Sequence, residues 1–310
     1  KSKGNVVVPN KPIEQFGADA VRYWAAAARL GLDATYDEGQ MKIGRRLAIK
    51  LLNASKFALA IGREDENHHV GETADAVWNP VDVTEPLDRA VMAKLALVIR
   101  QATDALNAYE HSKALEVIES FFWQFCDDYI ELVKNRAYGT ADAHGKVPSD
   151  AAVKSARTTL GLGLDAFARL LAPYLPFATE EVWSWMHTGE GSVHRAAWPK
   201  ADIYAAAATG ASPETLAWAG KAVEQLRKIK SEAKVSMKTP ILSVTLAAVK
   251  DGIDAIKSAL DDVAQAGRVI GKFDLAEKHA EEATAEGEGD DTVVIDASEL
   301  GEPPAKKAKK

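Results

Sequence analysis

The chain has 310 residues, of which 47% are hydrophobic and 27% are charged, and these proportions are ordinary for a globular protein. No apolar run approaches the length that spans a bilayer, so we expect no membrane partner. The single cysteine, Cys126, excludes a disulfide framework and favours a reducing, cytoplasmic location. The formal net charge of −7 argues weakly against a nucleic-acid partner, but global charge is a poor guide where basic residues cluster.

The N-terminal part predicts a basic loop followed by a helix. The first residue is Lys1 and no signal-peptide pattern follows it, so we expect a piece of a longer polypeptide. Residues 1–5 read KSKGN, and residues 13–28 carry apolar side chains at helical spacing. The polar stretch 33–37 ends this helix. The total length predicts roughly two or three domains.

Residues 38–61 predict a helix with one apolar and one basic face. The apolar face consists of Leu47, Leu51, Ala54, Ala58 and Ile61. A second face carries cations, an amide and an aromatic ring, and flanking cations extend it: Arg46, Lys50, Asn53 and Phe57, with Lys42, Arg45 and Lys56 beside them. Across this span the only acidic residue is Glu38.

This second face suits single-stranded RNA. Cations hold phosphates, an amide can read a base edge, and an aromatic ring stacks on a base. From the residues alone, an ordinary solvent-exposed helix face explains this pattern about as well as an RNA-binding face does. For Phe57 a further alternative is that the ring turns inward beside Ala54 and Ala58 and only packs.

Residues 62–83 predict a polar loop that contains the adjacent histidines His68 and His69. No set of Cys, Asp or Glu with ligand spacing accompanies them. We therefore interpret both as surface loop residues and expect no metal site.

Residues 112–139 predict the central helix of a bundle, because the apolar face is too wide for one neighbour to cover. Ser112 can cap its start and Gly139 can end it. Trp123 falls near the polar side and has no evident partner. Further helices are predicted at 84–109 and 149–172, and Gly161 and Gly163 in the second of these are expected to allow the close approach of another helix.

The pattern changes after the Ala-rich residues 201–211, which predict a domain boundary. Beyond them a helix is expected to expose Lys221, Arg227, Lys228 and Lys230. Alternating apolar and polar residues then predict a strand at 242–246. A helix is expected at 251–263, and two more strands are expected at 268–273 and 292–296. This is a small α/β module, and AKKAKK closes the chain as a basic tail.

Several segments carry a family resemblance. KSKGN resembles the second half of the KMSKS signature of class I aminoacyl-tRNA synthetases, and GADAVRYW resembles the segment that follows it in the valine, isoleucine and leucine subgroup. Residues 38–61 resemble the first helix of the anticodon-binding domain of these enzymes. FFWQFCDDYIELVKNRAYG is closer to the valyl members than to the isoleucyl or leucyl ones, and APYLPFATEEVWSWM also resembles the subgroup.

The resemblance implies a fold that is mainly α, namely a helical anticodon-binding bundle followed by a small α/β C-terminal domain. The implied domains are residues 1–36 (end of the signature loop and stem-contact segment), 37–205 (helical domain), 213–300 (α/β domain) and 301–310 (tail). Many valyl enzymes end in a coiled-coil arm, whereas the sustained heptads of a coiled coil are absent here.

The resemblance also implies a function for the parent enzyme. Such an enzyme activates valine with ATP and Mg²⁺ and transfers it to valine tRNA. Lys1 and Ser2 match the signature positions that serve ATP, and an ammonium near developing phosphate charge is electrostatic catalysis. The HIGH signature is absent from these 310 residues. We therefore expect RNA recognition here, no bound cofactor, no catalysis by this piece alone, and a monomer.

Three alternatives stay open at this level. The first alternative is a free-standing helical RNA-binding module, the second is the equivalent region of an isoleucyl enzyme, and the third is a helical scaffold for protein contacts. A scaffold needs no basic stripe at residues 42–56, so charge placement argues against it.

Overall fold

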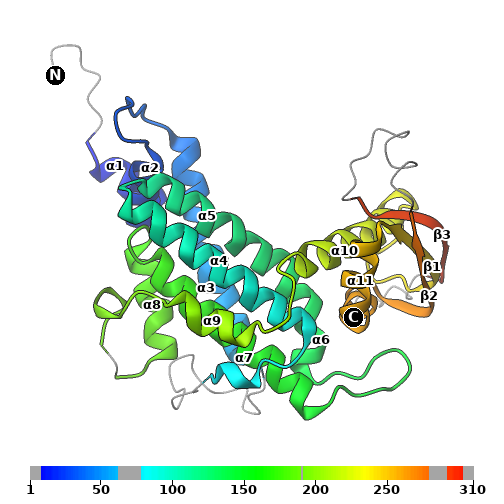
Figure 1. Ribbon diagram of the computed structural model, residues 1–310. Helices are drawn as coiled ribbons and strands as arrows, with labels where there is room; N and C mark the ends of the chain where they lie inside the picture. Colours follow the sequence, from blue (N-terminus) through cyan, green and yellow to red (C-terminus); the bar gives the residue numbers. More distant parts are fainter. Residues whose placement is uncertain (1–7, 62–77, 190, 279–291, 303–310) are drawn as a thin grey trace, which may run out of the picture. The chain divides into compact units, whose positions relative to one another are not determined.

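The computed structural model describes residues 8–61, 78–189, 191–278 and 292–302 (Figure 1). Helices dominate it, and a small sheet follows them, so the predicted mainly α fold class is confirmed. The chain divides into two compact units, which are described separately here. Unit 1 comprises residues 1–80, 95–126 and 157–206, and unit 2 comprises residues 81–94, 127–156 and 207–310.

Unit 1 begins with three helices, α1 (Asn10–Phe16), α2 (Ala18–Ala27) and α3 (Glu38–Ala60). The single helix predicted at 13–28 is broken at Gly17, whose φ of 94° favours glycine. The Asp37 side chain caps α3 by accepting hydrogen bonds from the backbone N–H groups of Gly39 (2.7 Å) and Gln40 (3.2 Å). Phe16 of α1 and Met41 of α3 share a small buried cluster.

The predicted central helix at 112–139 exists, but it is not one uniform α-helix. It consists of α5 (His111–Gln124), a π-helical turn at Phe125–Tyr129 and α6 (Ile130–Tyr138). Ser112 does not cap it, because α5 begins one residue earlier and no side chain caps its first turn. Gly139 ends α6 in the left-handed conformation, with φ of 70°, as predicted. Before it, α4 (Pro86–Asn107) follows the 3-10 turn η1 (Pro80–Asp82).

An aromatic cluster lies where α5 meets α7 (Asp150–Leu171) in unit 1. The ring of Phe167 lies 5.2 Å from that of Phe122 and 5.3 Å from that of Phe125, centroid to centroid. The close approach depends on Gly163, because a Cβ there would lie 2.7 Å from the Phe125 ring. Gly161 likewise lies against Trp78. The predicted close helix approach is therefore confirmed at Gly163, whereas Gly161 faces Trp78, which lies outside the helices.

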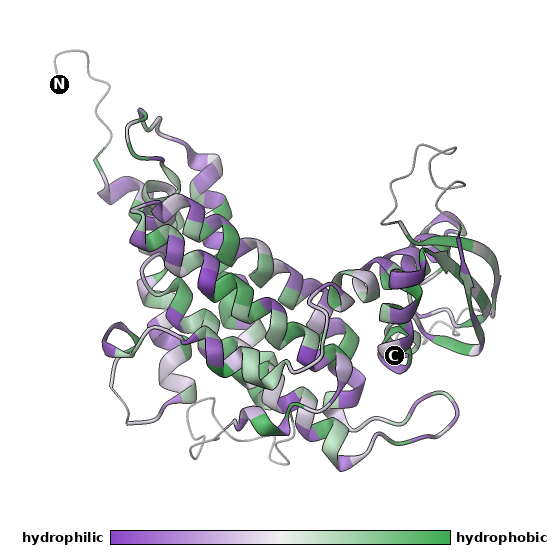
Figure 2. Ribbon diagram, viewed as in Figure 1, coloured by the Kyte–Doolittle hydropathy of each residue, from purple (hydrophilic) through white to green (hydrophobic). Residues whose placement is uncertain are grey.

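The rest of the helical region contains α8 (Pro176–Met186), the 3-10 turn η3 (Val193–Arg195) and α9 (Ala201–Ala207). Residues 201–211 are thus partly helical. Tyr204 of α9 is buried and its hydroxyl accepts a hydrogen bond from Arg169 at 3.1 Å. In Figure 2 green and purple residues alternate along the long helices, as expected for helices with one buried and one exposed face.

The C-terminal part of unit 2 is an α/β module. It contains α10 (Thr215–Glu232), β1 (Ile241–Ala248), α11 (Lys250–Ser258), α12 (Leu260–Gly267), β2 (Val269–Glu277) and β3 (Val294–Leu300). The strand order is β2-β1-β3, with β1 parallel to β2 and antiparallel to β3. Figure 1 shows α10 and α11 on the same side of this sheet.

Two sequence expectations about this module are wrong. The helix predicted at 251–263 is two helices. Lys230 is not exposed but buried, and its Nζ donates hydrogen bonds to the carbonyl oxygens of Gly267 (2.8 Å) and Met237 (3.2 Å). Burial, together with the nearby charges of Arg268 and Arg227, lowers the pKa of Lys230 to about 8.

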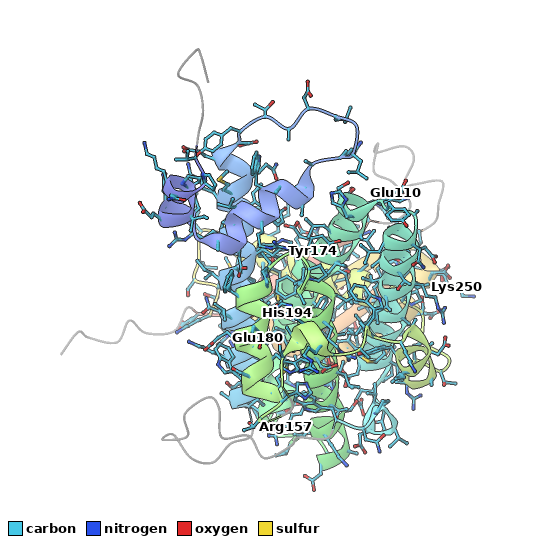
Figure 3. All side chains as sticks on the ribbon, turned by 90° about the vertical axis from the view of Figure 1, so that its left-hand side faces the viewer. Glu110, Arg157, Tyr174, Glu180, His194 and Lys250 are labelled. Carbon is cyan, nitrogen blue, oxygen red and sulfur yellow. The ribbon has the colours of Figure 1, made fainter. Side chains whose placement is uncertain are left out.

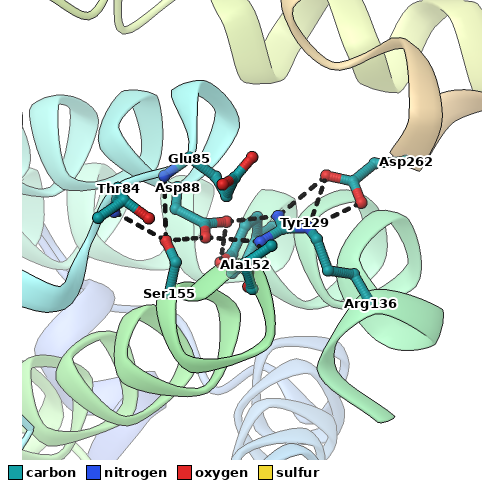
Figure 4. Close-up of polar contacts among 8 residues, drawn as sticks. All are labelled: Thr84, Glu85, Asp88, Tyr129, Arg136, Ala152, Ser155 and Asp262. Carbon is teal, nitrogen blue, oxygen red and sulfur yellow. Dashed lines mark hydrogen bonds and ion pairs between the residues drawn. The ribbon is translucent and has the colours of Figure 1, made fainter. Parts of the chain in front are cut away.

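A buried ionic cluster holds unit 2 together (Figure 4). Arg136 of α6 donates hydrogen bonds to Asp88 of α4 and to Asp262 of α12. Asp88 also accepts hydrogen bonds from Tyr129 (2.8 Å) and Ser155 (2.6 Å). This cluster places α12 of the α/β module directly against α6.

Candidate nucleic-acid interface

The predicted RNA-binding residues all lie on one face of α3. At 3.6 residues per turn they fall within an arc of about 140°. The opposite side of the helix holds its buried residues, which include Leu47, Leu51 and Ala54. Five of the seven side chains are exposed, namely Lys42, Arg45, Arg46, Asn53 and Lys56. The other two, Lys50 and Phe57, are partly buried. The structure therefore brings all seven together on the face that points away from the core.

The local sequence explains why this face stays outside. The buried side packs against α2 and α8, and Gly44 lets α2 come so close that a Cβ there would lie 2.5 Å from the Cβ of Tyr23. Figure 3 shows α3 in blue beside the green α8, on which Glu180 is labelled. Because two helices cover the apolar side, the charged side remains accessible.

Two of the lysines lie over tryptophan rings. Lys50 Nζ lies 5.9 Å from the centroid of Trp123 on α5, and Lys56 Nζ lies 5.4 Å from that of Trp185 on α8. Both distances suit a cation–π interaction. Arg45 donates a hydrogen bond to the carbonyl oxygen of Gln15 at 2.9 Å. These contacts hold three of the five cations near defined positions.

The partner of Trp123, which the sequence does not reveal, is Glu119. The indole Nε1–H of Trp123 donates to Glu119 Oε1 at 3.1 Å, and the Tyr23 hydroxyl donates to Glu119 Oε2 at 2.6 Å. Burial and the Glu119 carboxylate raise the pKa of Tyr23, so its hydroxyl remains a donor. Tyr23, Glu119 and Trp123 thus form a fixed row that leads to Lys50.

The same arrangement recurs on the other side of α3. Trp185 Nε1–H donates to Glu181 Oε1 at 3.1 Å, one turn earlier on α8. In both cases a glutamate four residues before a tryptophan orients the ring beneath a lysine of α3. The spacing of Glu119 and Trp123, repeated at Glu181 and Trp185, is the sequence signal that could have found both rings.

A cavity of about 1140 Å³ adjoins α3 in unit 1. Tyr23, Glu119 and Trp123 line it together with Gln40 of α3 and Arg29. Its walls come from the segment between α2 and α3 and from the turn between α4 and α5. The ring of Trp123 is therefore accessible from this side, whereas Trp185 is buried.

Phe57 is partly buried, so its ring neither turns fully inward nor stands free.

Lys1 and Ser2, and also His68 and His69, lie outside the described residues. In the described part of the chain no three His, Cys, Asp or Glu side chains gather into a possible metal site. None of its helices is long and apolar enough to cross a membrane.

The helical region thus presents a basic face on α3 with tryptophan rings of α5 and α8 at its edges. The sequence model described as "Anticodon-binding domain of tRNA ligase" matches residues 88–246, just over half of the chain. The chain belongs to this family. Helix α3 lies before the matched range.

The chain is 82% identical over 309 residues to the valine–tRNA ligase of Bifidobacterium longum (strain NCC 2705), covering 100% of this chain and 34% of that protein. It is 49% identical over 271 residues to the valine–tRNA ligase of Thermobifida fusca (strain YX), covering 87% of this chain and 28% of the relative. The chain thus spans about a third of the curated relatives it matches. Among solved structures it is similar to LeuRS in the LeuRS–tRNA–LeuAMS complex of Agrobacterium radiobacter K84 agnB2, with 16% identity, a TM-score of 0.45, and coverage of 89% of this chain and 31% of that one.

Proposed function

We propose that this chain is the tRNA-recognition part of a valine–tRNA ligase. The observation that carries the proposal is the 82% identity along the whole chain to a protein of that name. The full-length protein then joins valine to valine tRNA, and ATP with Mg²⁺ belongs to that reaction. Lys1 and Ser2 are proposed to serve ATP within the longer protein.

Within this proposal, the exposed face of α3 binds the RNA. Lys42, Arg46 and Lys56 are exposed cations that suit phosphate groups. Asn53 lies between them on the same face, and its amide can donate to and accept from a base edge. The partly exposed ring of Phe57 offers a surface for stacking. Lys50 and Arg45, which already contact protein groups, add positive charge at the edges of the face.

The domain organisation remains part of the proposal. Residues 1–36 are proposed as the end of the signature loop and the stem-contact segment, residues 37–205 as the helical recognition domain, residues 213–300 as the α/β domain and residues 301–310 as a basic tail. The protein is proposed to act as a monomer in the cytoplasm.

Binding of a valine tRNA transcript to this chain tests the proposal. The double variant Lys42→Ala/Arg46→Ala should weaken binding and flatten the dependence of affinity on salt, because each lost phosphate contact releases fewer counterions. Lys257→Ala is the matched control, since Lys257 is an exposed lysine on α11, which belongs to unit 2 rather than to unit 1. Equal affinities for the double variant and the control would refute the assignment to α3.

A further inference from the structure

Sequence reasoning ends the RNA-binding face at α3, but the side chains continue it onto α5. Lys50 lies at the edge of the face, about 120° around the helix from Lys56. At that edge its ammonium lies 5.9 Å from the centroid of Trp123. Trp123 is partly exposed and lines the cavity beside α3. The face therefore acquires an aromatic ring from a second helix.

We propose that Trp123 is a stacking platform for one unpaired nucleotide of the tRNA, with Lys50 beside the ring for the phosphate of that nucleotide. This inference rests on the proposed function, because it names a further contact of the same interface. Tyr23 and Glu119 are positioning residues, which orient the ring without touching the RNA.

The hydrogen bonds decide which kind of contact Trp123 makes. Its only donor, Nε1–H, is already bonded to Glu119, so the indole cannot read a base edge by hydrogen bonding. The second oxygen of Glu119 accepts from Tyr23 at 2.6 Å, which fixes the carboxylate and hence the plane of the ring. What the indole can offer a base is stacking on the side of the ring that Lys50 does not cover, and such stacking tolerates any base.

The cavity supplies the room that a base needs. Its volume of about 1140 Å³ is slightly above the range of about 300–1,000 Å³ that is usual for small-molecule sites. Phe57 lies seven residues after Lys50, or about 10 Å along the helix axis. Lys50 and Phe57 are thus about two turns apart on α3, and the proposal assigns them to different nucleotides of one strand.

Trp185 provides a matched comparison within the same chain. It has the same glutamate one turn earlier and the same lysine of α3 over its ring. It differs in being buried, with 7% of its surface exposed. If accessibility is what makes Trp123 a binding residue, then equal substitutions at the two positions should act differently.

The experiment measures the affinity of the full 310-residue chain for an RNA hairpin that carries the anticodon stem-loop of a valine tRNA. Trp123→Leu should weaken binding about 5- to 150-fold, the range expected for loss of one stacked base. Trp123→Phe should restore most of the affinity because it restores a ring. Trp185→Leu should lower the thermal stability and weaken binding much less than Trp123→Leu, because it loosens Lys56 but removes no exposed ring.

A set of hairpins that each lack one loop base separates stacking from a structural effect. The penalty of Trp123→Leu should disappear for the hairpin that lacks the stacked base and persist for the others. The same penalty with every hairpin, or none with the intact one, would overturn the inference. If Trp123→Leu does not fold, photo-crosslinking of wild-type protein with 5-iodouridine at each loop position decides: a crosslink to Trp123 supports stacking, and crosslinks only elsewhere refute it.

The same measurements distinguish this inference from the proposed function. If Lys42→Ala/Arg46→Ala weakens binding and Trp123→Leu does not, only the stacking role of Trp123 fails. If neither variant weakens binding, the RNA-binding role of α3 fails as well.

Discussion

Arg136 and Asp262 form a buried two-pronged ion pair, with Nε 2.9 Å from Oδ1 and Nη2 2.9 Å from Oδ2. The same guanidinium also donates to both oxygens of Asp88, at 2.8 Å and 2.7 Å. One cation therefore faces two carboxylates in the interior of unit 2. The two carboxylates are not equivalent, because Asp88 has further donors in Tyr129 and Ser155.

We expect Asp88→Ala to cost about 3–5 kcal/mol of unfolding free energy, because it removes the main partner of a buried charge. It also leaves the hydroxyls of Tyr129 and Ser155 without their acceptor. Asp262→Asn should cost less than about 1 kcal/mol at pH 7, since an amide oxygen still accepts from Arg136 and the excess negative charge is gone. Urea unfolding of both variants measures the difference, and equal costs would contradict this ranking.

The pH dependence of the unfolding free energy should reflect the protonation of the Asp262 carboxyl. Burial raises the pKa of this carboxyl to about 6 despite Arg136, and Asp88 and Glu85 add to the rise. The folded protein then binds more protons than the unfolded chain between pH 4 and 6. The stabilising contribution of protonated Asp262 is complete below the ordinary value of 3.8 and is lost as the pH rises through 6.

The measurement compares wild type with Asp262→Asn at several pH values. The unfolding free energy of wild type minus that of the variant should fall from pH 4 to pH 6.5, by at most about 3 kcal/mol. A difference that rises over this window would show that the charged carboxylate is the stabilising form.

Phe125→Ala should cost about 3–5 kcal/mol, as for a large aromatic side chain in a packed core. Phe125 is fully buried, and Gly163 and Phe167 pack against it. Phe177→Ala is the control, because Phe177 is 67% exposed and should change stability by less than about 0.5 kcal/mol. Thermal or urea unfolding tests the pair, and a cost below about 1 kcal/mol at Phe125 would mean that this helix is not central.

Asn53→Ala and Phe57→Ala should reduce discrimination between valine tRNA and a version with an exchanged anticodon. Loss of a stacked ring corresponds to about 1–3 kcal/mol. Lys50→Ala should instead weaken both tRNAs alike and lower the salt slope. Titrations of both tRNAs at two salt concentrations test this, with folding checked in parallel. A Phe57→Ala variant that is less stable but discriminates normally would show that the ring only packs.

The sequence by itself determined the helices and the composition of the α3 face. Both follow from the 3.6-residue period, so Leu47 and Leu51 separate from Arg46 and Asn53 without any tertiary information. The family resemblance rested on equally local stretches. Gly139 ended its helix as predicted, because a left-handed residue after a helix is a local event.

The tertiary structure alone decided which side chains meet across the chain. Tyr23 and Glu119 are 96 residues apart, and Arg136 and Asp262 are 126 apart, so no periodicity connects them. Lys230 has the sequence signature of an exposed lysine and is buried because two carbonyl oxygens satisfy its ammonium. The lysine over the Trp123 ring was hidden for the same reason, since Lys50 comes from another helix. Packing sets such pairs, and packing depends on the whole fold rather than on any one segment.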